Sequence, residues 1–125
     1  MSEENKVTLT SANAAIAQGD LEGFLAFCTD DTAWTYVGQQ TLQGKEAVRQ
    51  YLAKSSEEPP RFTVTDLIAE GDFLTAIGAI TMREDGKLVD YTYCDVWRFR
   101  GGKMAELRAF VIKTGPEGEA MARPE

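Results

Sequence analysis

The sequence predicts an α+β protein in which helices occupy mainly the first half of the chain and a sheet occupies the second half. Three observations support this prediction. Apolar residues recur at helical spacing as far as Lys54, and Pro59-Pro60 then excludes a helix interior. From Arg61 to Thr114 the chain is strand-like, and turn signals divide it into four strands.

Three helices are expected in the first half. The first covers residues 7–18 and is followed by Gly19, a residue that favours helix ends. Asp20 then has the position of an N-cap for a short second helix, and a third helix covers residues 44–54. The apolar faces of these helices consist of Leu9, Ala12 and Ile16, of Leu21, Phe24, Leu25 and Cys28, and of Ala47, Val48, Tyr51 and Leu52.

One strand is expected before the third helix, at residues 33–37, with Trp34 and Tyr36 on one side. After the proline pair, Glu70-Gly71-Asp72 separates two further strands, and Asp85-Gly86 predicts a type I′ hairpin. Counting from that hairpin gives the pairs Met82 with Val89, Ile80 with Tyr91, and Gly78 with Tyr93. The glycine of the last pair leaves room opposite a large ring.

The longest predicted strand, residues 88–100, carries one carboxylate on an otherwise apolar and aromatic face. That face consists of Val89, Tyr91, Tyr93, Asp95, Trp97 and Phe99. An ionised carboxylate in apolar surroundings costs several kcal/mol, so Asp95 should be paired, hydrogen-bonded or protonated at neutral pH. Desolvation is expected to raise its pKa, and either a structural or a functional role fits such a residue.

The turn at Gly101-Gly102 leaves two registers open. A two-residue loop places Arg108 opposite Asp95 and puts an ion pair on the inner face, whereas a three-residue loop starting at Arg100 places Leu107 there. Burying two charged side chains on an aromatic face is the costlier arrangement, so the three-residue loop is preferred. Its inner face then contains Ala105, Leu107, Ala109 and Val111.

Composition narrows the classes of function. With 13 basic and 20 acidic residues, the formal net charge is −7, so nucleic acid and acidic membrane surfaces are poor partners. No apolar run approaches the roughly 20 residues of a membrane helix, and residues 1–6 do not resemble a signal peptide, so a cytoplasmic protein is expected. Because the chain has no histidine and Cys28 and Cys94 lack C-x-x-C spacing, neither a metal nor another cofactor is predicted.

Three segments resemble the nuclear-transport-factor-2-like superfamily. These are AQGDLEGFLAFCTDD, similar to its helix-Gly-Asp-helix opening, LQGKEAVRQYL, similar to its third helix, and YCDVWRFRGGKMAELRAFV, similar to its terminal hairpin. The resemblance covers residues 9–114 and is nearest to the branch of SnoaL-like polyketide cyclases and ketosteroid isomerases. It implies a cystatin-like cone, in which a curved antiparallel sheet wraps around three helices. Residues 1–125 would form one SnoaL-like domain, with a core at about 7–114 and a mobile tail at 115–125.

The resemblance also suggests a site. Asp95 corresponds to the protonated acid in the oxyanion hole of ketosteroid isomerases, whereas the positions of the catalytic base and the oxyanion tyrosine hold Tyr36 and Ala12. SnoaL-like cyclases also use an aspartate in a hydrophobic pocket. The resemblance therefore implies isomerase-, cyclase- or hydratase-type chemistry on an apolar, carbonyl-bearing substrate, with Asp95 as acid or base and with Tyr36 or a neighbouring tyrosine as a hydrogen-bond donor. The residues expected to bind the ligand are Trp34, Tyr91, Tyr93, Trp97, Ile80, Met82 and Leu107.

Two other functions remain open on this fold: a non-catalytic protein that binds hydrophobic ligands, and a dimerisation module. A homodimer is expected in each case, because Val96, Phe110 and Ile112 place apolar side chains on the outer sheet face. A second titratable group near Asp95 would favour the enzyme. A real cavity is also expected, because large aromatic residues face Ala76, Gly78, Ala105 and Ala109.

Overall fold

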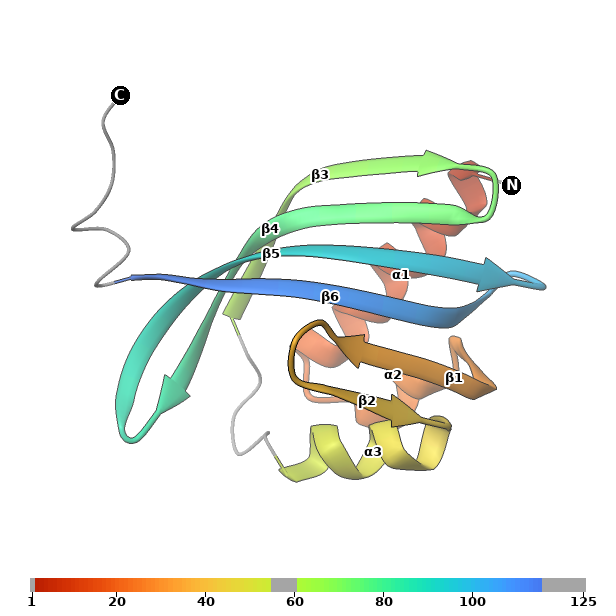
Figure 1. The fold of residues 1–125 in the computed structure, drawn as a ribbon. Coiled ribbons are helices and arrows are strands. Elements are labelled where there is room, and N and C mark those ends of the chain that lie inside the picture. Colours follow the sequence, from red (N-terminus) through yellow and green to blue (C-terminus); the bar gives the residue numbers. More distant parts are fainter. Residues whose placement is uncertain (1, 55–60, 116–125) are drawn as a thin grey trace.

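The structure, a computed structural model, describes residues 2–54 and 61–115. Most of the predicted tail, residues 116–125, lies outside this range. Figure 1 shows the elements in chain order, which are α1 (Ser2–Ala17), α2 (Leu21–Leu25), β1 (Cys28–Tyr36), β2 (Gln40–Gln43), α3 (Lys45–Lys54), β3 (Arg61–Glu70), β4 (Phe73–Glu84), β5 (Lys87–Arg100) and β6 (Lys103–Gly115). The predicted α+β class is confirmed.

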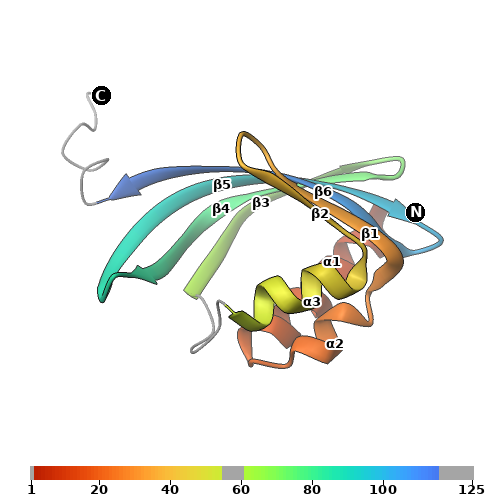
Figure 2. The same ribbon diagram turned by 60° about the horizontal axis from the view of Figure 1, so that its bottom comes forward.

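The strands form one open sheet in the order β2-β1-β6-β5-β4-β3. Every neighbouring pair is antiparallel except β1 and β6, which run parallel, so the sheet is mixed rather than purely antiparallel. Figure 2 shows the sheet arching over the three helices, which all lie on its concave side. The sequence reasoning missed β2, which pairs with β1 because Gly38, at φ +87°, lets the chain turn back.

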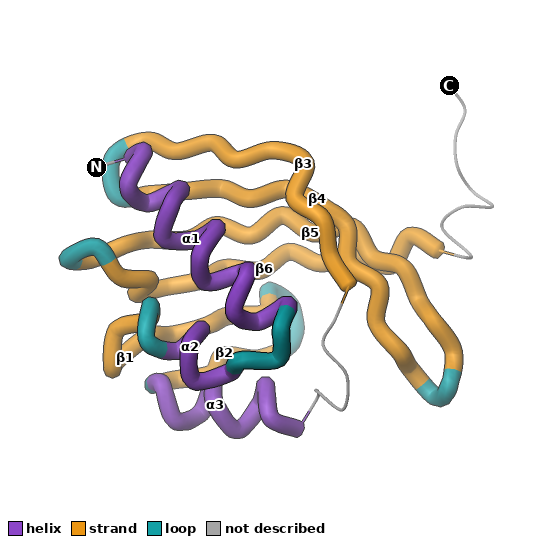
Figure 3. Tube along the Cα trace, turned by 180° about the vertical axis from the view of Figure 1, so that it is seen from behind, coloured by secondary structure: helices purple, strands orange, loops and turns teal. Residues whose placement is uncertain are grey.

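The helices begin and end where the chain chemistry allows. Helix α1 starts five residues before the predicted range, with Glu3 in its first turn paired to Lys6 at 3.6 Å. Asp20 caps α2 as predicted, because its Oδ1 accepts the Gly23 backbone N–H at 2.9 Å. Figure 3 shows α1 crossing the concave face of the sheet, where Leu9 and Ala12 are buried.

The β4–β5 hairpin has the predicted register, with Gly78 opposite Tyr93. Asp85 and Gly86 both have positive φ, as a type I′ turn requires. A Cβ atom at Gly78 would lie 2.0 Å from the carbonyl oxygen of Thr63 and 2.7 Å from the hydroxyl of Tyr93. The glycine therefore lets the Tyr93 ring cross β4 and donate a hydrogen bond to the Thr63 carbonyl at 3.0 Å.

The β5–β6 hairpin corrects the predicted register. The turn has two residues, with Arg100 paired to Lys103, but a bulge follows, so that Asp95 lies opposite Ala109 instead of Leu107. The preferred three-residue loop was therefore wrong. The bulge moves the pairs from Arg98 to Tyr91 by one residue. This keeps Leu107 and Ala109 on the inner face, as predicted, and leaves Glu106 outside to pair with Arg98 at 2.9 Å.

Cross-strand neighbours align in rows on the concave face. We call one of them the Trp97 row. It runs through Leu42, Trp34, Leu107, Trp97, Leu74 and Ala69. The Trp34 ring meets Phe24 of α2 and Trp97 edge-on, each with centroids 5.7 Å apart. This row and the helices packed on it form the main core.

Candidate functional site

The next row on the same face contains the predicted acid, and we call it the Asp95 row. It runs through Gln40, Tyr36, Ala109, Asp95, Ala76 and Leu67. Asp95 is thus flanked by an alanine on each side, and both alanines are buried. Because an alanine side chain carries no polar atom, neither neighbour can give the carboxyl group a hydrogen bond through its side chain.

Asp95 is partly buried, and no described residue gives it a hydrogen bond or an ion pair. Burial disfavours its charged form and raises its pKa to about 7. This agrees with the expectation from the sequence that desolvation dominates. A pKa raised toward neutrality suits a group that both takes and gives a proton.

Tyr36 lies in the same row, two strands away across Ala109. Burial is the main cause that raises the pKa of its hydroxyl, and the nearby Tyr51 and Asp95 raise it further. The Tyr36 and Tyr51 rings are 5.3 Å apart and tilted by 37°. Tyr36 therefore keeps its proton and can act only as a hydrogen-bond donor or acceptor.

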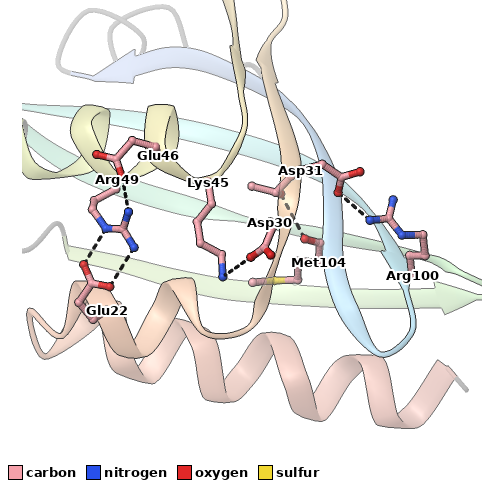
Figure 4. A network of polar contacts seen from close by, with 9 residues as sticks. Glu22, Asp30, Asp31, Lys45, Glu46, Arg49, Arg100 and Met104 are labelled. Atoms are coloured by element: carbon pink, nitrogen blue, oxygen red, sulfur yellow. Dashed lines mark hydrogen bonds and ion pairs between the residues drawn. The ribbon is translucent and has the colours of Figure 1, made fainter.

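Tyr51 is the member of this group that sequence reasoning missed as a site residue, because helical spacing assigned it to the apolar face of the third helix. The only sequence signal was a hydroxyl-bearing ring on that face. Ion pairs drawn in Figure 4 link helix α3, which carries Tyr51, to α2 and β1. Arg49 bonds Glu22 of α2 at 2.8 Å and also Glu46, and Lys45 reaches Asp30 of β1 at 3.4 Å.

Other predicted site residues lie in the buried rows next to Asp95. Trp34, Trp97 and Leu107 are buried in the Trp97 row, and the indole N–H of Trp34 has no hydrogen-bond partner among the described residues. Tyr93 is buried on the other side of Asp95, and its pKa is raised to about 12 by burial and by Asp95. Its hydroxyl is engaged at Thr63, so Tyr93 contributes a wall rather than a free donor.

Three further predicted residues, Ile80, Met82 and Tyr91, lie farther along the β4–β5 hairpin. Tyr91 is four residues from Asp95 on β5, a distance of roughly 13 Å along an extended strand. Its hydroxyl donates to Glu84, and this bond is the main cause that raises its pKa to about 12. The structure therefore brings Tyr36, Tyr93 and Trp97 around Asp95 but leaves Tyr91 outside that group.

The part of the chain that the structure describes contains no group of three His, Cys, Asp or Glu side chains able to hold a metal ion. No described helix is long and apolar enough to cross a membrane. Two surface hollows bounded by described residues have volumes of about 210 and 190 Å³, beside α1 and along β3 and β4, and neither includes Asp95. The cavity expected beside Asp95 stays a prediction.

The SnoaL-like domain family matches residues 9–107. This chain belongs to that family. No curated protein matches the chain. The family membership and the fold confirm the nuclear-transport-factor-2-like superfamily suggested by the sequence segments.

Solved structures of the same fold include enzymes. The chain is 19% identical to SalBIII, an epoxide hydrolase/cyclase-like enzyme in pyran ring formation of the polyether salinomycin, with a TM-score of 0.81 over 87% of this chain and 91% of that one. It is 15% identical to an LEH-like epoxide hydrolase of M. tuberculosis, with a TM-score of 0.80 over 88% and 84%. An NTF2-like protein of Burkholderia xenovorans LB400 is 22% identical, with a TM-score of 0.76 over 89% and 91%. At these identities the likeness concerns the fold.

Proposed function

We propose that this SnoaL-like protein is an enzyme of isomerase, cyclase or hydratase type, in which Asp95 moves a proton on an apolar, carbonyl-bearing substrate. The observation that carries the proposal is the Asp95 carboxyl group itself. It is desolvated, has no partner among the described residues and lies among aromatic rings on the concave face. A structural aspartate in such surroundings is normally hydrogen-bonded.

The pKa of Asp95 suits this role. A general acid or base is most effective when its pKa lies near the working pH, and burial raises that of Asp95 to about 7. The ionised form would remove a proton from the carbon next to the substrate carbonyl. The protonated form would then return the proton to another carbon, for an isomerisation, or to an oxygen, for a ring closure or dehydration.

Tyr36 would stabilise the substrate oxygen as negative charge develops on it. Its raised pKa keeps the hydroxyl protonated, and a neutral donor in a desolvated site favours an enolate strongly. The names of the similar structures, an epoxide hydrolase/cyclase-like enzyme and an LEH-like epoxide hydrolase, agree with proton-transfer chemistry on this fold. The charge of −7 and the absence of a cation in the Asp95 row favour neutral substrates over anionic ones.

The test measures deuterium exchange at the carbon next to the carbonyl. The protein is incubated in D2O with a panel of polycyclic ketones and aromatic polyketides, and NMR monitors the exchange. We expect exchange with at least one of them and a loss of about 10²–10⁴-fold in Asp95→Asn. Asp90→Asn is the matched control, because Asp90 is an exposed carboxylate on the same strand that bonds Thr81. Equal exchange in Asp95→Asn and the parent protein would contradict the proposal.

The alternative is a non-catalytic protein that binds hydrophobic ligands in the same place. The same panel separates the two functions, because binding measured by calorimetry without any exchange would favour the alternative. Tyr36 favours the enzyme, because it is a second titratable group near Asp95.

We further propose a homodimer formed by the convex sheet face. Phe110 is 41% exposed and Ile112 is 67% exposed, and the partly exposed Val96 lies diagonally across from Phe110 on β5. Contiguous apolar residues on a sheet face are characteristic of an interface. Sedimentation velocity at micromolar concentration should show a dimer, and Phe110→Lys combined with Ile112→Lys should show a monomer; a monomeric parent protein contradicts this proposal.

A further inference from the structure

The inner face of the β4–β5 hairpin continues beyond Asp95 toward the turn at Asp85-Gly86. Figures 1 and 3 show that this end of the hairpin reaches past the helices, and Figure 2 shows that it curls toward the concave side. We call three residues of this end the hairpin arm: Ile80 and Met82 of β4, and Tyr91 of β5, which lies opposite Ile80. All three side chains are partly exposed. Ile80 packs against the main core, and Met82 and Tyr91 lie beyond it.

Tyr93 lies flat on the sheet between Asp95 and the hairpin arm. Its hydroxyl reaches the Thr63 carbonyl of β3 at 3.0 Å, on the far side of β4. A Cβ atom at Gly78 of β4 would lie 2.9 Å from Cζ of that ring, so the ring passes directly over the glycine. A tyrosine held in this way covers the sheet instead of standing up from it. On β4 and β5, no described side chain therefore stands between Asp95 and the arm.

Tyr91 turns away from Asp95. Its hydroxyl donates to the carboxylate of Glu84, which is four residues nearer the turn than Ile80. The polar atom of the Tyr91 side chain is thus already bonded, and Ile80 has none. Lys113, opposite Tyr91 on β6, is exposed and marks the edge of this apolar face. The arm therefore offers apolar contact without a free hydrogen-bond donor, which suits an apolar chain or ring system.

We infer that the hairpin arm binds the part of the substrate remote from its carbonyl group, so that the substrate is elongated and Met82 is a specificity-determining residue. The inference rests on the proposed function, because it takes Asp95 as the end where the carbonyl lies. Four residues of extended strand, or roughly 13 Å, separate Asp95 from Tyr91. An alkyl chain of about ten carbon–carbon bonds covers that length. Small ketones would reach Asp95 without touching the arm.

The position of the arm favours a substrate over a second copy of the chain. The arm is continuous with the face that carries Asp95, through Gly78 and Tyr93. Phe110 and Ile112, which form the proposed dimer contact, lie on the opposite face of the sheet. A ligand on the arm therefore leaves that contact free.

The experiment uses a series of 4-alkylcyclohexanones with tails from methyl to dodecyl. Calorimetry measures their binding to the full chain, and NMR in D2O monitors exchange of the hydrogens next to the carbonyl. In the parent protein each methylene that reaches the arm should tighten binding about two- to fourfold, because it leaves water for an apolar surface. The gain should stop once the tail extends past Met82.

Met82→Gln keeps the length of the side chain but makes its end polar. It should weaken binding of the dodecyl ketone about tenfold and leave that of the methyl ketone unchanged. Leu88→Gln is the matched control, because Leu88 is 46% exposed on the outer face of the same hairpin. This variant should bind every member of the series as the parent protein does.

The inference is overturned if no member binds, if affinity does not depend on tail length, or if Met82→Gln acts no more strongly than Leu88→Gln. A change in sedimentation instead of ligand binding in Met82→Gln would assign the arm to a second copy and overturn it too. If Met82→Gln does not fold, the dependence on tail length in the parent protein still decides.

The proposed function fails in a different way. Equal exchange of the methyl ketone in Asp95→Asn and the parent protein contradicts the function and leaves the measured tail dependence as it is. Binding that depends on tail length but gives no exchange supports the arm and contradicts catalysis alone. Exchange that depends on Asp95 but not on tail length supports the function and overturns the arm.

Discussion

The Trp97 row and the Asp95 row are neighbours on the same six strands and the same face, yet one is tightly packed with apolar side chains and the other contains an unpaired acid. In the Trp97 row large apolar groups meet edge to edge, and the central four residues are at most 4% exposed. In the Asp95 row the two residues beside the acid are alanines, and the acid has no partner among the described residues. Two residues along each strand separate a packed core from a polar group that burial destabilises.

The difference shows how this fold can hold an unpaired carboxylate. Tight packing in one row supplies the apolar contacts, since the aromatic edges of Phe24, Trp34 and Trp97 interlock there. The adjacent row can then retain a group that opposes folding, as functional sites commonly do. The predictions below alter each row in turn.

Trp97→Ala should have the largest effect, because it removes the centre of the packed row. Trp97 is 4% exposed and meets Trp34 edge-on at 5.7 Å. Truncating a buried tryptophan to alanine costs about 3–5 kcal/mol of unfolding free energy. Urea denaturation measures the loss, and Val96→Ala, on the outer face of the same strand, should lose far less. A loss below about 1 kcal/mol for Trp97→Ala would mean that this row is not the core.

Asp95→Leu should instead stabilise the protein, and only above acidic pH. The pKa of Asp95 is raised in the folded state from 3.8 to about 7, so the folded protein holds this proton more tightly than the unfolded chain does. The favourable contribution of protonated Asp95 to the unfolding free energy of the parent protein is therefore fully present below about pH 4. It is lost as the pH rises to about 7. The difference in unfolding free energy between Asp95→Leu and the parent protein should therefore be roughly 2–4 kcal/mol larger at pH 8 than at pH 4, in favour of the variant.

Urea denaturation of both proteins between pH 4 and pH 8 measures this difference, and Asp90→Asn should show none. A difference between Asp95→Leu and the parent protein that stays constant with pH would contradict the desolvation of Asp95. The exchange assay adds to this measurement, because Asp95→Leu should raise the unfolding free energy and abolish exchange. If Asp95 were a structural residue, the same substitution would lower both.

The sequence could predict the contents of each row better than its exact alignment. Period-two alternation placed Tyr93, Asp95 and Trp97 on the inner face, because side chains in a strand alternate strictly. Counting residues from Gly101-Gly102 could not predict the bulge. A bulge lets a two-residue turn still bury Leu107 and expose Glu106, and nothing in the local sequence marks it. The parallel pairing of β1 with β6 was likewise missed, because it joins segments about 70 residues apart and leaves no local signal.

The site was predictable where chemistry is visible in one strand and unpredictable where it needs a second element. Asp95 stood out because a carboxylate interrupts an aromatic face. Tyr51 did not, since a tyrosine on the apolar face of a helix usually packs by its ring. It meets Tyr36 only in the folded chain, because the two rings come from different elements, α3 and β1. Tyr91 was overvalued as a neighbour of Asp95 for the converse reason, because alternation fixes its face but not its distance from that acid.

Tyr93→Phe gives the smallest effect and sharpens the contrast with its neighbour Asp95. Both residues place a polar group on the concave face, but the Tyr93 hydroxyl is satisfied by the Thr63 carbonyl at 3.0 Å, which Gly78 allows it to reach. Removing a satisfied, partly buried hydroxyl should therefore cost about 0.5–1.5 kcal/mol, whereas removing the unsatisfied acid should stabilise. Urea denaturation at pH 8 measures the unfolding free energy of both variants, with Tyr91→Phe, whose hydroxyl bonds the exposed Glu84, as the control. If Tyr93→Phe were stabilising, its hydrogen bond across β4 would be strained, and the contrast between the two polar groups would fail.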